Sequence, residues 1–308
     1  MTNNIPQNIV IVGSGTQGSM LAFRSAAYGR NVCLYDLSAE SAERAMRKIK
    51  IWFDEYVAKG KLEADFAEKA FQSITVASDP KASLKDADLV IENVPEILEL
   101  KQKVWAEIDA AAPEKTLLTT NSSSLKSSDI GIRVKRKDKT FNLNFMTPTE
   151  DDLVEVMWNA STSEETKLAV LGFLKAQNNV PIITAKEIKG FSLNRVWRAV
   201  KKECLKLWAD QYISPEDFDR AWMLEWGTPY GPFALMDKVG LDIVKQIELT
   251  YYAESGDPKD MPPSKLDEMI AKGHLGVKTR KGFYEYPNPA YEQPGWLRGE
   301  HTKGAHTK

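Results

Sequence analysis

Apolar residues at the start of the chain form a run of strand length, residues 8–12, which leads directly into a Gly-x-Gly-x-x-Gly turn at residues 13–18. A helical pattern begins at Ser19, and a second apolar run at residues 31–35 ends in Asp36. Strand, glycine-rich turn, helix and strand in this order are typical of a βαβ unit that holds a dinucleotide. The opening pattern therefore predicts an α/β domain built on a parallel sheet.

Further apolar runs and periodic segments continue this α/β pattern. They predict strands at residues 74–76, 87–94, 116–120, 140–145, 153–157 and 180–184, and helices at residues 98–111 and 163–176. Two charged segments of helical period, 39–59 and 63–72, meet at Gly60 and predict a helical hairpin inserted after Asp36. The lysines of this hairpin indicate either a solvated face or a contact with an anionic part of a substrate.

The pattern changes after residue 187, where no further βαβ unit follows. Residues 191–210, 214–225 and 231–254 have helical period, and their tryptophans at helical spacings predict helix packing: Trp197, Trp208, Trp222 and Trp226. We therefore expect a Rossmann-type NAD-binding domain at residues 1–187, with a mostly parallel sheet and the inserted hairpin. An all-α domain for substrate binding and dimerisation is expected at residues 188–287, followed by an irregular tail at 288–308.

Composition narrows the class of protein. The chain has 308 residues, of which 43% are hydrophobic and 27% charged, and its formal net charge is −2. Such a balance gives no general attraction to nucleic acid or to an anionic membrane. The start of the chain lacks the features of a signal peptide, and no apolar run approaches the roughly 18 residues of a membrane span. Cys33 and Cys204 indicate reduced core residues, so we expect a cytoplasmic protein, and we expect no metal.

The glycine turn has the chemistry of a pyrophosphate site. Its glycines permit a tight turn and a close approach of the phosphates, which would sit on free N–H groups at the positive end of a helix. We expect contacts to the cofactor from Gly13, Ser14, Gly15, Thr16, Gln17 and Gly18. Asp36 stands where a carboxylate binds the ribose hydroxyls, and no arginine follows it to receive a 2′-phosphate, which predicts NAD rather than NADP.

Two polar clusters follow predicted strands, at residues 93–96 and 121–124. In open α/β sheets ligands bind outside the carboxyl ends of the strands, so these clusters are expected to extend the site begun by the glycine turn. We expect Asn121, and Thr147 after the next strand, to be part of the cofactor site.

Taken together, these motifs resemble the 3-hydroxyacyl-CoA dehydrogenase family along the chain to about residue 286. The motifs further include Pro95-Glu96, Leu153-Val154-Glu155-Val156, Gly190-Phe191-Ser192-Leu193-Asn194-Arg195, Pro229-Tyr230-Gly231-Pro232-Phe233, Val239-Gly240-Leu241-Asp242 and Leu275-Gly276-Val277-Lys278-Thr279. The resemblance implies an N-terminal NAD-binding domain whose inserted hairpin faces an acyl-CoA, and a helical C-terminal domain that forms a homodimer.

The resemblance also implies roles for single residues. Glu96, Lys101 and Lys278 would contact the cofactor, and Ser123 would present a hydroxyl to the substrate. Asn194 would supply an amide that helps to position the substrate oxygen.

The sequence departs from the family at its catalytic base. The family has His-Phe-Phe-Asn-Pro, whereas this chain has Asn144-Phe145-Met146-Thr147-Pro148. Oxidation of an alcohol needs a group that accepts the hydroxyl proton, and an amide cannot ionise to do so, although it can donate a hydrogen bond to an oxygen. Glu155, which orients the histidine in the family, either becomes the base itself, directly or through a water, or is a relic hydrogen-bonded to Asn144. Lys189 is a further candidate base.

The expected function is therefore NAD-dependent hydride transfer at a hydroxyl-bearing carbon of a specialised hydroxy acid or acyl-CoA. Two alternatives stay open. An acidic turn at residues 150–152 and the nearby Trp158 would suit a dehydrogenase for an amine, with an aldehyde as a related possibility. The missing base would equally suit a catalytically decayed protein that still binds NAD.

Overall fold

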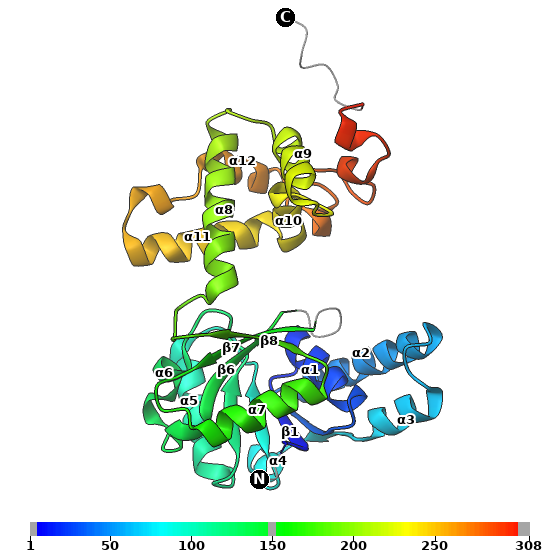
Figure 1. Cartoon of the computed structure of the whole chain (residues 1–308), viewed down its shortest axis with the longest axis vertical. Coiled ribbons are helices and arrows are strands. Elements are labelled where there is room, and N and C mark those ends of the chain that lie inside the picture. The colour runs from blue at the N-terminus through cyan, green and yellow to red at the C-terminus, as the bar shows by residue number, and fades with distance from the viewer. Residues whose placement is uncertain (1–4, 147–151, 301–308) are drawn as a thin grey trace, which may run out of the picture. The chain divides into compact units, whose positions relative to one another are not determined.

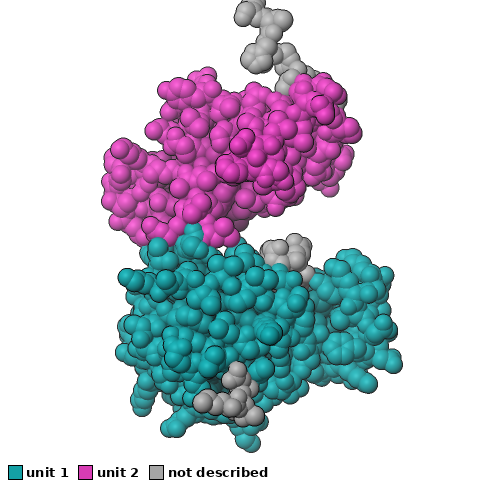
Figure 2. All heavy atoms as spheres, viewed as in Figure 1, with its two compact units in different colours: residues 1–192 teal, residues 193–308 magenta. Residues whose placement is uncertain are grey.

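The computed structural model describes residues 5–146 and 152–300. The chain forms two compact units, Met1–Ser192 and Leu193–Lys308, which Figure 2 distinguishes by colour. The predicted boundary after residue 187 differs by a short segment. Residues 188–192 belong with the first unit, where the Gly190 N–H donates to the carbonyl of Ser124 and the Ser192 hydroxyl donates to Glu155.

The first unit is organised around an eight-stranded sheet in the order β3-β2-β1-β4-β5-β6-β7-β8 (Figure 1). All neighbouring pairs are parallel except β6 and β7, which are antiparallel. This confirms the predicted Rossmann-type arrangement. The order of the strands reverses between β1 and β4, and such folds bind nucleotides at this point of the sheet. The strands are β1 Asn8–Val12, β2 Asn31–Tyr35, β3 Ile74–Ala77, β4 Leu89–Glu92, β5 Leu117–Thr120, β6 Thr140–Phe145, β7 Leu153–Trp158 and β8 Val180–Thr184.

Helices connect the strands and cover the sheet. The central strands are apolar throughout and buried, as β4 illustrates with all four of its residues, because a parallel sheet is covered on both faces. The predicted helices after β1, β4 and β7 are present, and two short helices that the pattern did not reveal follow β3 and β5. The helices outside the hairpin are α1 Thr16–Ala27, α4 Pro80–Leu84, α5 Leu98–Ala111, α6 Ser127–Ile130 and α7 Glu164–Ala176.

The predicted hairpin consists of α2, Ala39–Ala58, and α3, Ala64–Gln72, which lie side by side in Figure 1. The turn between them contains Gly60 in a left-handed conformation, with φ +65°. The ring of Phe53 lies 4.7 Å from that of Phe23 on α1, so the hairpin is anchored to the first helix of the nucleotide fold through aromatic contacts.

The second unit is helical, as the pattern predicted, with one difference. The predicted single helix at residues 231–254 is two helices, because Gly240 between them has φ +101°, which an α-helix cannot contain. Trp208 is buried as expected, but Trp226 leaves 66% of its surface exposed. The helices are α8 Ser192–Ala209, α9 Pro215–Trp226, α10 Pro232–Val239, α11 Leu241–Ser255 and α12 Ser264–Ala271.

Two buried carboxylates hold the loops of the second unit. Asp219 accepts the backbone N–H groups at the start of α10, and Asp237 accepts those of Phe283 and Tyr284 at 2.9 Å each. Burial raises the pKa of each carboxyl to about 6. Within the expected irregular tail, Ala290–Glu292 and Trp296–Arg298 form two short 3₁₀ turns, and Trp296 is only 1% exposed, so this described part of the tail packs into the unit's core.

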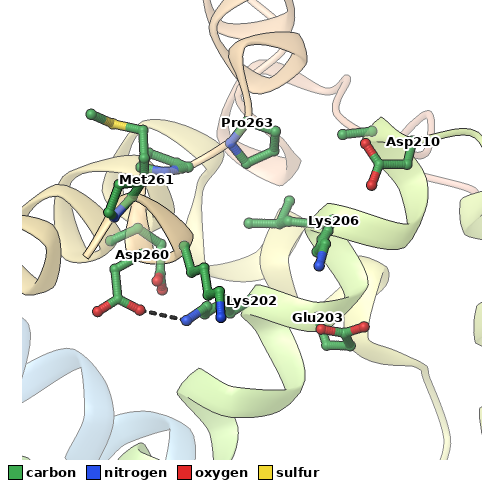
Figure 3. Close-up of a pocket in the computed structure, with 13 residues that line it drawn as sticks. Lys202, Glu203, Lys206, Asp210, Asp260, Met261 and Pro263 are labelled. Carbon is green, nitrogen blue, oxygen red and sulfur yellow. Dashed lines mark hydrogen bonds and ion pairs between the residues drawn. The ribbon is translucent and has the colours of Figure 1, made fainter.

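Ion pairs tie α8 to α11 and to the turn that follows it. Arg198 lies 2.9 Å from Asp260, and Lys201 lies 2.8 Å from the buried Glu248. Figure 3 shows Lys202 pointing toward Asp260 at the edge of a cavity of about 400 Å³. The cavity wall carries both lysines and carboxylates, so opposite charges on the wall largely balance each other. Among the residues that the structure describes, none forms a helix that is both long enough and apolar enough to span a bilayer.

Candidate active site

The glycine turn has the shape that a dinucleotide requires. A Cβ on Gly18 would lie 1.9 Å from the carbonyl oxygen of Gly13, so α1 packs against the turn at a distance only glycine allows. Gly13 has φ +99°, and a Cβ there would lie 2.8 Å from the carbonyl oxygen of Asn93. A Cβ on Gly15 would meet nothing within 4 Å. The space above Gly15 lies at the N-terminus of α1, which begins at Thr16, and so fits a pyrophosphate.

Asp36 stands at the end of β2, beside the glycine turn. Its Oδ2 accepts the backbone N–H and the hydroxyl of Ser14, both at 2.7 Å, and its Oδ1 accepts the N–H of Ser38 at 2.9 Å. Burial alone would raise the pKa of Asp36, but these hydrogen bonds outweigh it and hold the pKa below its usual value. The side chain is thus a fixed carboxylate at the position expected for the ribose acceptor.

The two predicted polar clusters meet at the carboxyl ends of the central strands. Asn121 donates to Asn93 Oδ1 at 2.9 Å, and its own Oδ1 accepts the N–H of Phe145 at 2.9 Å. It therefore connects the ends of β4, β5 and β6. Gln17 on α1 donates to the carbonyl of Met146 at 3.1 Å. Gln17, Asn93 and Asn121 thus lie at the carboxyl ends of the central strands.

Glu96 organises the serine loop, which we define as residues 122–125. Glu96 Oε1 accepts hydrogen bonds from the hydroxyls of Ser122 and Ser124, the latter at 2.6 Å. Burial acts to raise the pKa of Glu96, but Lys101 and the two serines hold it below its usual value. Ser123, the expected substrate-facing hydroxyl, is exposed.

Lys101, which we expect to contact the cofactor, is buried. Its side chain is 2% exposed, and Nζ lies 2.7 Å from Glu92 Oε1 and 3.3 Å from Glu96 Oε2. It also donates to the carbonyl of Val94 at 3.0 Å. An ammonium has three donors, so these three acceptors account for its hydrogen-bonding capacity.

Asn144 and Glu155 face each other across the antiparallel pair β6 and β7. Asn144 Nδ2 donates to Glu155 Oε2 at 3.1 Å, and Ser192 donates to Glu155 Oε1 at 3.0 Å. Asn144 is 4% exposed and Glu155 1%. The hydrogen bond to Asn144 is the one that the relic interpretation requires, and it also places a carboxylate one hydrogen bond from Asn144.

The segment that carries Lys189 runs along the serine loop and α6. Gly190 donates to the carbonyl of Ser124 at 2.9 Å, and Glu187 accepts the hydroxyl of Ser127 at 3.1 Å. Lys189 is exposed on this segment. Because Gly190 contacts Ser124, the backbone at Lys189 lies near the serine loop. Lys189 stays the second candidate for the base.

Two of the predicted site residues belong to the second unit. Asn194 is on α8 of the second unit, and Lys278 belongs to the same unit, where Nζ lies 2.6 Å from both carboxylate oxygens of Asp242. Thr147 lies outside the described residues.

The structure weakens the amine interpretation. Residues 150 and 151 lie outside the described range, and Asp152 forms an ion pair with Arg24 at 2.6 Å. Trp158 ends the strand that Asp152 precedes, about 20 Å away at the rise of an extended chain, and its ring packs against Phe141 at 5.6 Å. Among the described residues, Asp152 and Trp158 are thus separated by the length of β7 and do not form a cation site together.

Sequence reasoning assigned no role to Glu92, Thr120 and Ser192. Glu92 is the last residue of an otherwise apolar buried strand and is itself fully buried. A carboxylate at the end of such an apolar strand was the feature of the sequence that could have pointed to a role for Glu92. Ser192 gave none, because its contact with Glu155 depends on the chain returning to the sheet.

Comparison with known proteins gives a consistent result over both units. Residues 8–188 match the NAD-binding domain of 3-hydroxyacyl-CoA dehydrogenase, and residues 190–286 match its C-terminal domain. The 3-hydroxybutyryl-CoA dehydrogenase of Clostridioides difficile is 34% identical over 280 residues, which cover 90% of this chain and 99% of that protein.

Solved structures agree. The (S)-3-hydroxybutyryl-CoA dehydrogenase PaaH1 of Ralstonia eutropha has a TM-score of 0.83 and 31% identity, covering 92% of this chain and 100% of its own. A diketoreductase that acts on dicarbonyl compounds has a TM-score of 0.84 and 32% identity at the same coverage. The matches confirm the resemblance drawn from the motifs and the choice of NAD as cofactor. The chain belongs to the 3-hydroxyacyl-CoA dehydrogenase family of NAD-dependent oxidoreductases.

Proposed function

We propose that this protein transfers a hydride between NAD and a hydroxyl-bearing carbon of a specialised hydroxy acid or acyl-CoA, with Glu155 as proton acceptor. The observation that carries the proposal is the hydrogen-bonded pair of Asn144 and Glu155 across β6 and β7. A general base contributes roughly 10²–10⁴-fold to such a reaction. The amide of Asn144 cannot take a proton, and the carboxylate that can is its direct partner.

The residues divide the work as follows. NAD, when bound by the glycine turn and Asp36, supplies the hydride acceptor. Asn144 uses one N–H for Glu155, and its second N–H has as a neighbour the Sδ of Met146 at 3.6 Å, a weak acceptor. A substrate oxygen is a better acceptor than a thioether and would take that N–H. The substrate proton then passes to Glu155, directly or through a water.

The substrate class follows from the hairpin and the relatives. Residues 39–72 contain seven basic and seven acidic side chains, and pairs such as Lys50 with Asp54 at 2.6 Å neutralise much of the charge. A hairpin of this charge gives no general attraction to the phosphates of CoA. The relatives named above include an enzyme for a CoA thioester and one for dicarbonyl compounds. We therefore keep free hydroxy acids beside acyl-CoA esters in the proposal.

The first test is a screen of NADH formation across hydroxy acids and hydroxyacyl-CoA esters, repeated with Asn144→His. We expect the wild-type protein to turn over at least one substrate and Asn144→His to lose that activity. Asn178→His, an exposed change at the end of α7, serves as the matched control.

The rival function is a decayed dehydrogenase that binds NAD without turnover, which the same Asn144–Glu155 hydrogen bond supports. It predicts no activity in the wild-type protein and a gain of hydroxyacyl-CoA activity in Asn144→His. That result would overturn the proposed function.

We also propose a cytoplasmic homodimer formed through the helical unit. Both cysteines are free thiols, and four aliphatic side chains of α8 and α11 are 37–65% exposed: Leu193, Val196, Ile243 and Ile247. These four side chains are our candidates for the dimer contact, because apolar side chains that gather on a surface mark interaction sites. Light scattering after gel filtration should give a dimer for the wild-type protein and a smaller mass for Val196→Glu. A wild-type monomer at all concentrations would refute the dimer.

A further inference from the structure

The candidate active site rests on a buried charged network at the ends of β4 and β5. Glu92 ends β4 and is 0% exposed, and Lys101 on the first turn of α5 is 1% exposed. Buried charges are costly unless they are paired and fully hydrogen-bonded. A pair of this kind directly beneath a predicted cofactor site therefore calls for a role.

Both carboxylate oxygens of Glu92 accept hydrogen bonds. Its Oε1 accepts the N–H of Val94 and the ammonium of Lys101, both at 2.7 Å, and its Oε2 accepts the hydroxyl of Thr120 at 2.8 Å. Burial raises the pKa of Glu92, while Lys101 and the other donors oppose that rise. The carboxylate thus fixes three segments at once: the turn after β4, the start of α5 and the end of β5.

The network continues from Glu92 to the residues expected to meet the cofactor and the substrate. Lys101 reaches Glu96 Oε2 at 3.3 Å, and Glu96 Oε1 holds the hydroxyls of Ser122 and Ser124. On the other branch, Thr120 Oγ1 accepts the N–H of Ser122 at 3.1 Å. Both branches end on the serine loop, the loop that presents Ser123.

From this geometry we infer that Glu92 is a positioning residue: through Lys101 it fixes Glu96 and the serine loop in the arrangement that binds NAD. The inference rests on the proposed NAD-dependent function and adds a residue to which the motifs assigned no role. Glu92 touches neither cofactor nor substrate and acts through its neighbours.

The arrangement predicts that the effect of Glu92 on cofactor binding depends on Lys101. In Glu92→Gln the amide can no longer balance the buried ammonium, so Lys101 and Glu96 rearrange. In a protein that already carries Lys101→Met, only the Thr120 branch still connects Glu92 to the serine loop, so the change at Glu92 has a smaller effect. Effects of residues that act as one unit do not add, and a double-mutant cycle measures this.

The experiment measures the NADH dissociation constant by fluorescence titration for the wild-type protein, Glu92→Gln, Lys101→Met and the double variant. We expect a rise of about tenfold in Glu92→Gln, as for the loss of one hydrogen bond to a charged group. The change at Glu92 should raise the dissociation constant by a smaller factor in the Lys101→Met background than in the wild-type protein. Thr120→Val, which removes one donor to Glu92 without stranding a charge, should raise the constant about threefold and serves if Glu92→Gln does not fold.

Asp109→Asn is the matched control. Asp109 pairs with Arg136 at 2.7 Å with both side chains largely buried, in the same unit but near the last turn of α5. The Asp109→Asn variant should have a lower melting temperature, as Glu92→Gln does, and unchanged NADH binding. Equal NADH affinity in the wild-type protein, Glu92→Gln and Thr120→Val, or independent effects in the double variant, would overturn the inference alone. Failure of the wild-type protein to bind NADH would overturn the proposed function with it.

Discussion

Gly15→Ala separates cofactor binding from folding in the glycine turn. Gly15 has φ −60° and ψ −167°, which alanine adopts without strain, and its new Cβ would meet no atom within 4 Å. The folded protein should therefore lose only the difference between glycine and alanine before a helix, about 1 kcal/mol. The methyl group would, however, fill the space in which we expect the pyrophosphate.

The magnitude follows from the hydrogen bonds that the methyl group would displace. A phosphate held off the N–H groups at the start of α1 loses at least two charge-assisted hydrogen bonds, each worth roughly 1.5–3 kcal/mol. The expected loss is about 3 kcal/mol or more, which corresponds to more than a hundredfold in the NADH dissociation constant.

The assay combines NADH fluorescence titration with thermal unfolding. Gly18→Ala is the comparison, because its Cβ would lie 1.9 Å from the Gly13 oxygen. That overlap should destabilise the protein itself by roughly 2–3 kcal/mol, or about 5–10 °C in melting temperature. A Gly15→Ala protein that binds NADH as the wild type does would refute the assignment of the turn to the pyrophosphate.

The remaining predictions concern the ribose site and the buried carboxylates. Asp36→Ala should raise the NAD dissociation constant about tenfold in the same titration. NADP binding should stay unchanged or improve, because a carboxylate repels a 2′-phosphate. Tighter binding of NADP than of NAD by the wild-type protein would contradict the choice of cofactor. Asp219 and Asp237 have pKa values raised to about 6, so the stability they give is complete below the unfolded value near 4 and is lost as the pH rises through 6. Each should contribute about 3 kcal/mol to this loss. Calorimetry should show a melting temperature that falls between pH 5 and pH 7, and a rise over that interval would contradict the prediction.

The fold followed from the pattern of apolar residues because the pattern and the burial have the same cause. The strands of a parallel sheet are covered on both faces and are therefore apolar throughout, as in β4. The pattern failed where helical period continued across a residue that cannot be helical. Gly240 lies between two amphipathic segments, so the predicted single helix is in fact α10 and α11.

The candidate site was predictable as far as single motifs reached. The glycine turn and Asp36 are local features, and their contact through Ser14 follows from adjacent parallel strands. The pairing of Lys101 with Glu92 depends on how α5 returns over β4, which no local pattern records. The contacts of Lys101 with Glu92, Glu96 and the carbonyl of Val94 could not be predicted for the same reason.

The central claim, that Glu155 accepts the substrate proton in place of the missing histidine, is tested most directly by the turnover number of Glu155→Gln. The variant keeps the size of the side chain and can still contact Asn144 and Ser192, and NADH binding, measured alongside, shows that the cofactor site is intact. We predict unchanged NADH affinity and a turnover number lowered by roughly 10²-fold or more. A Glu155→Gln protein with the wild-type turnover number would contradict the account.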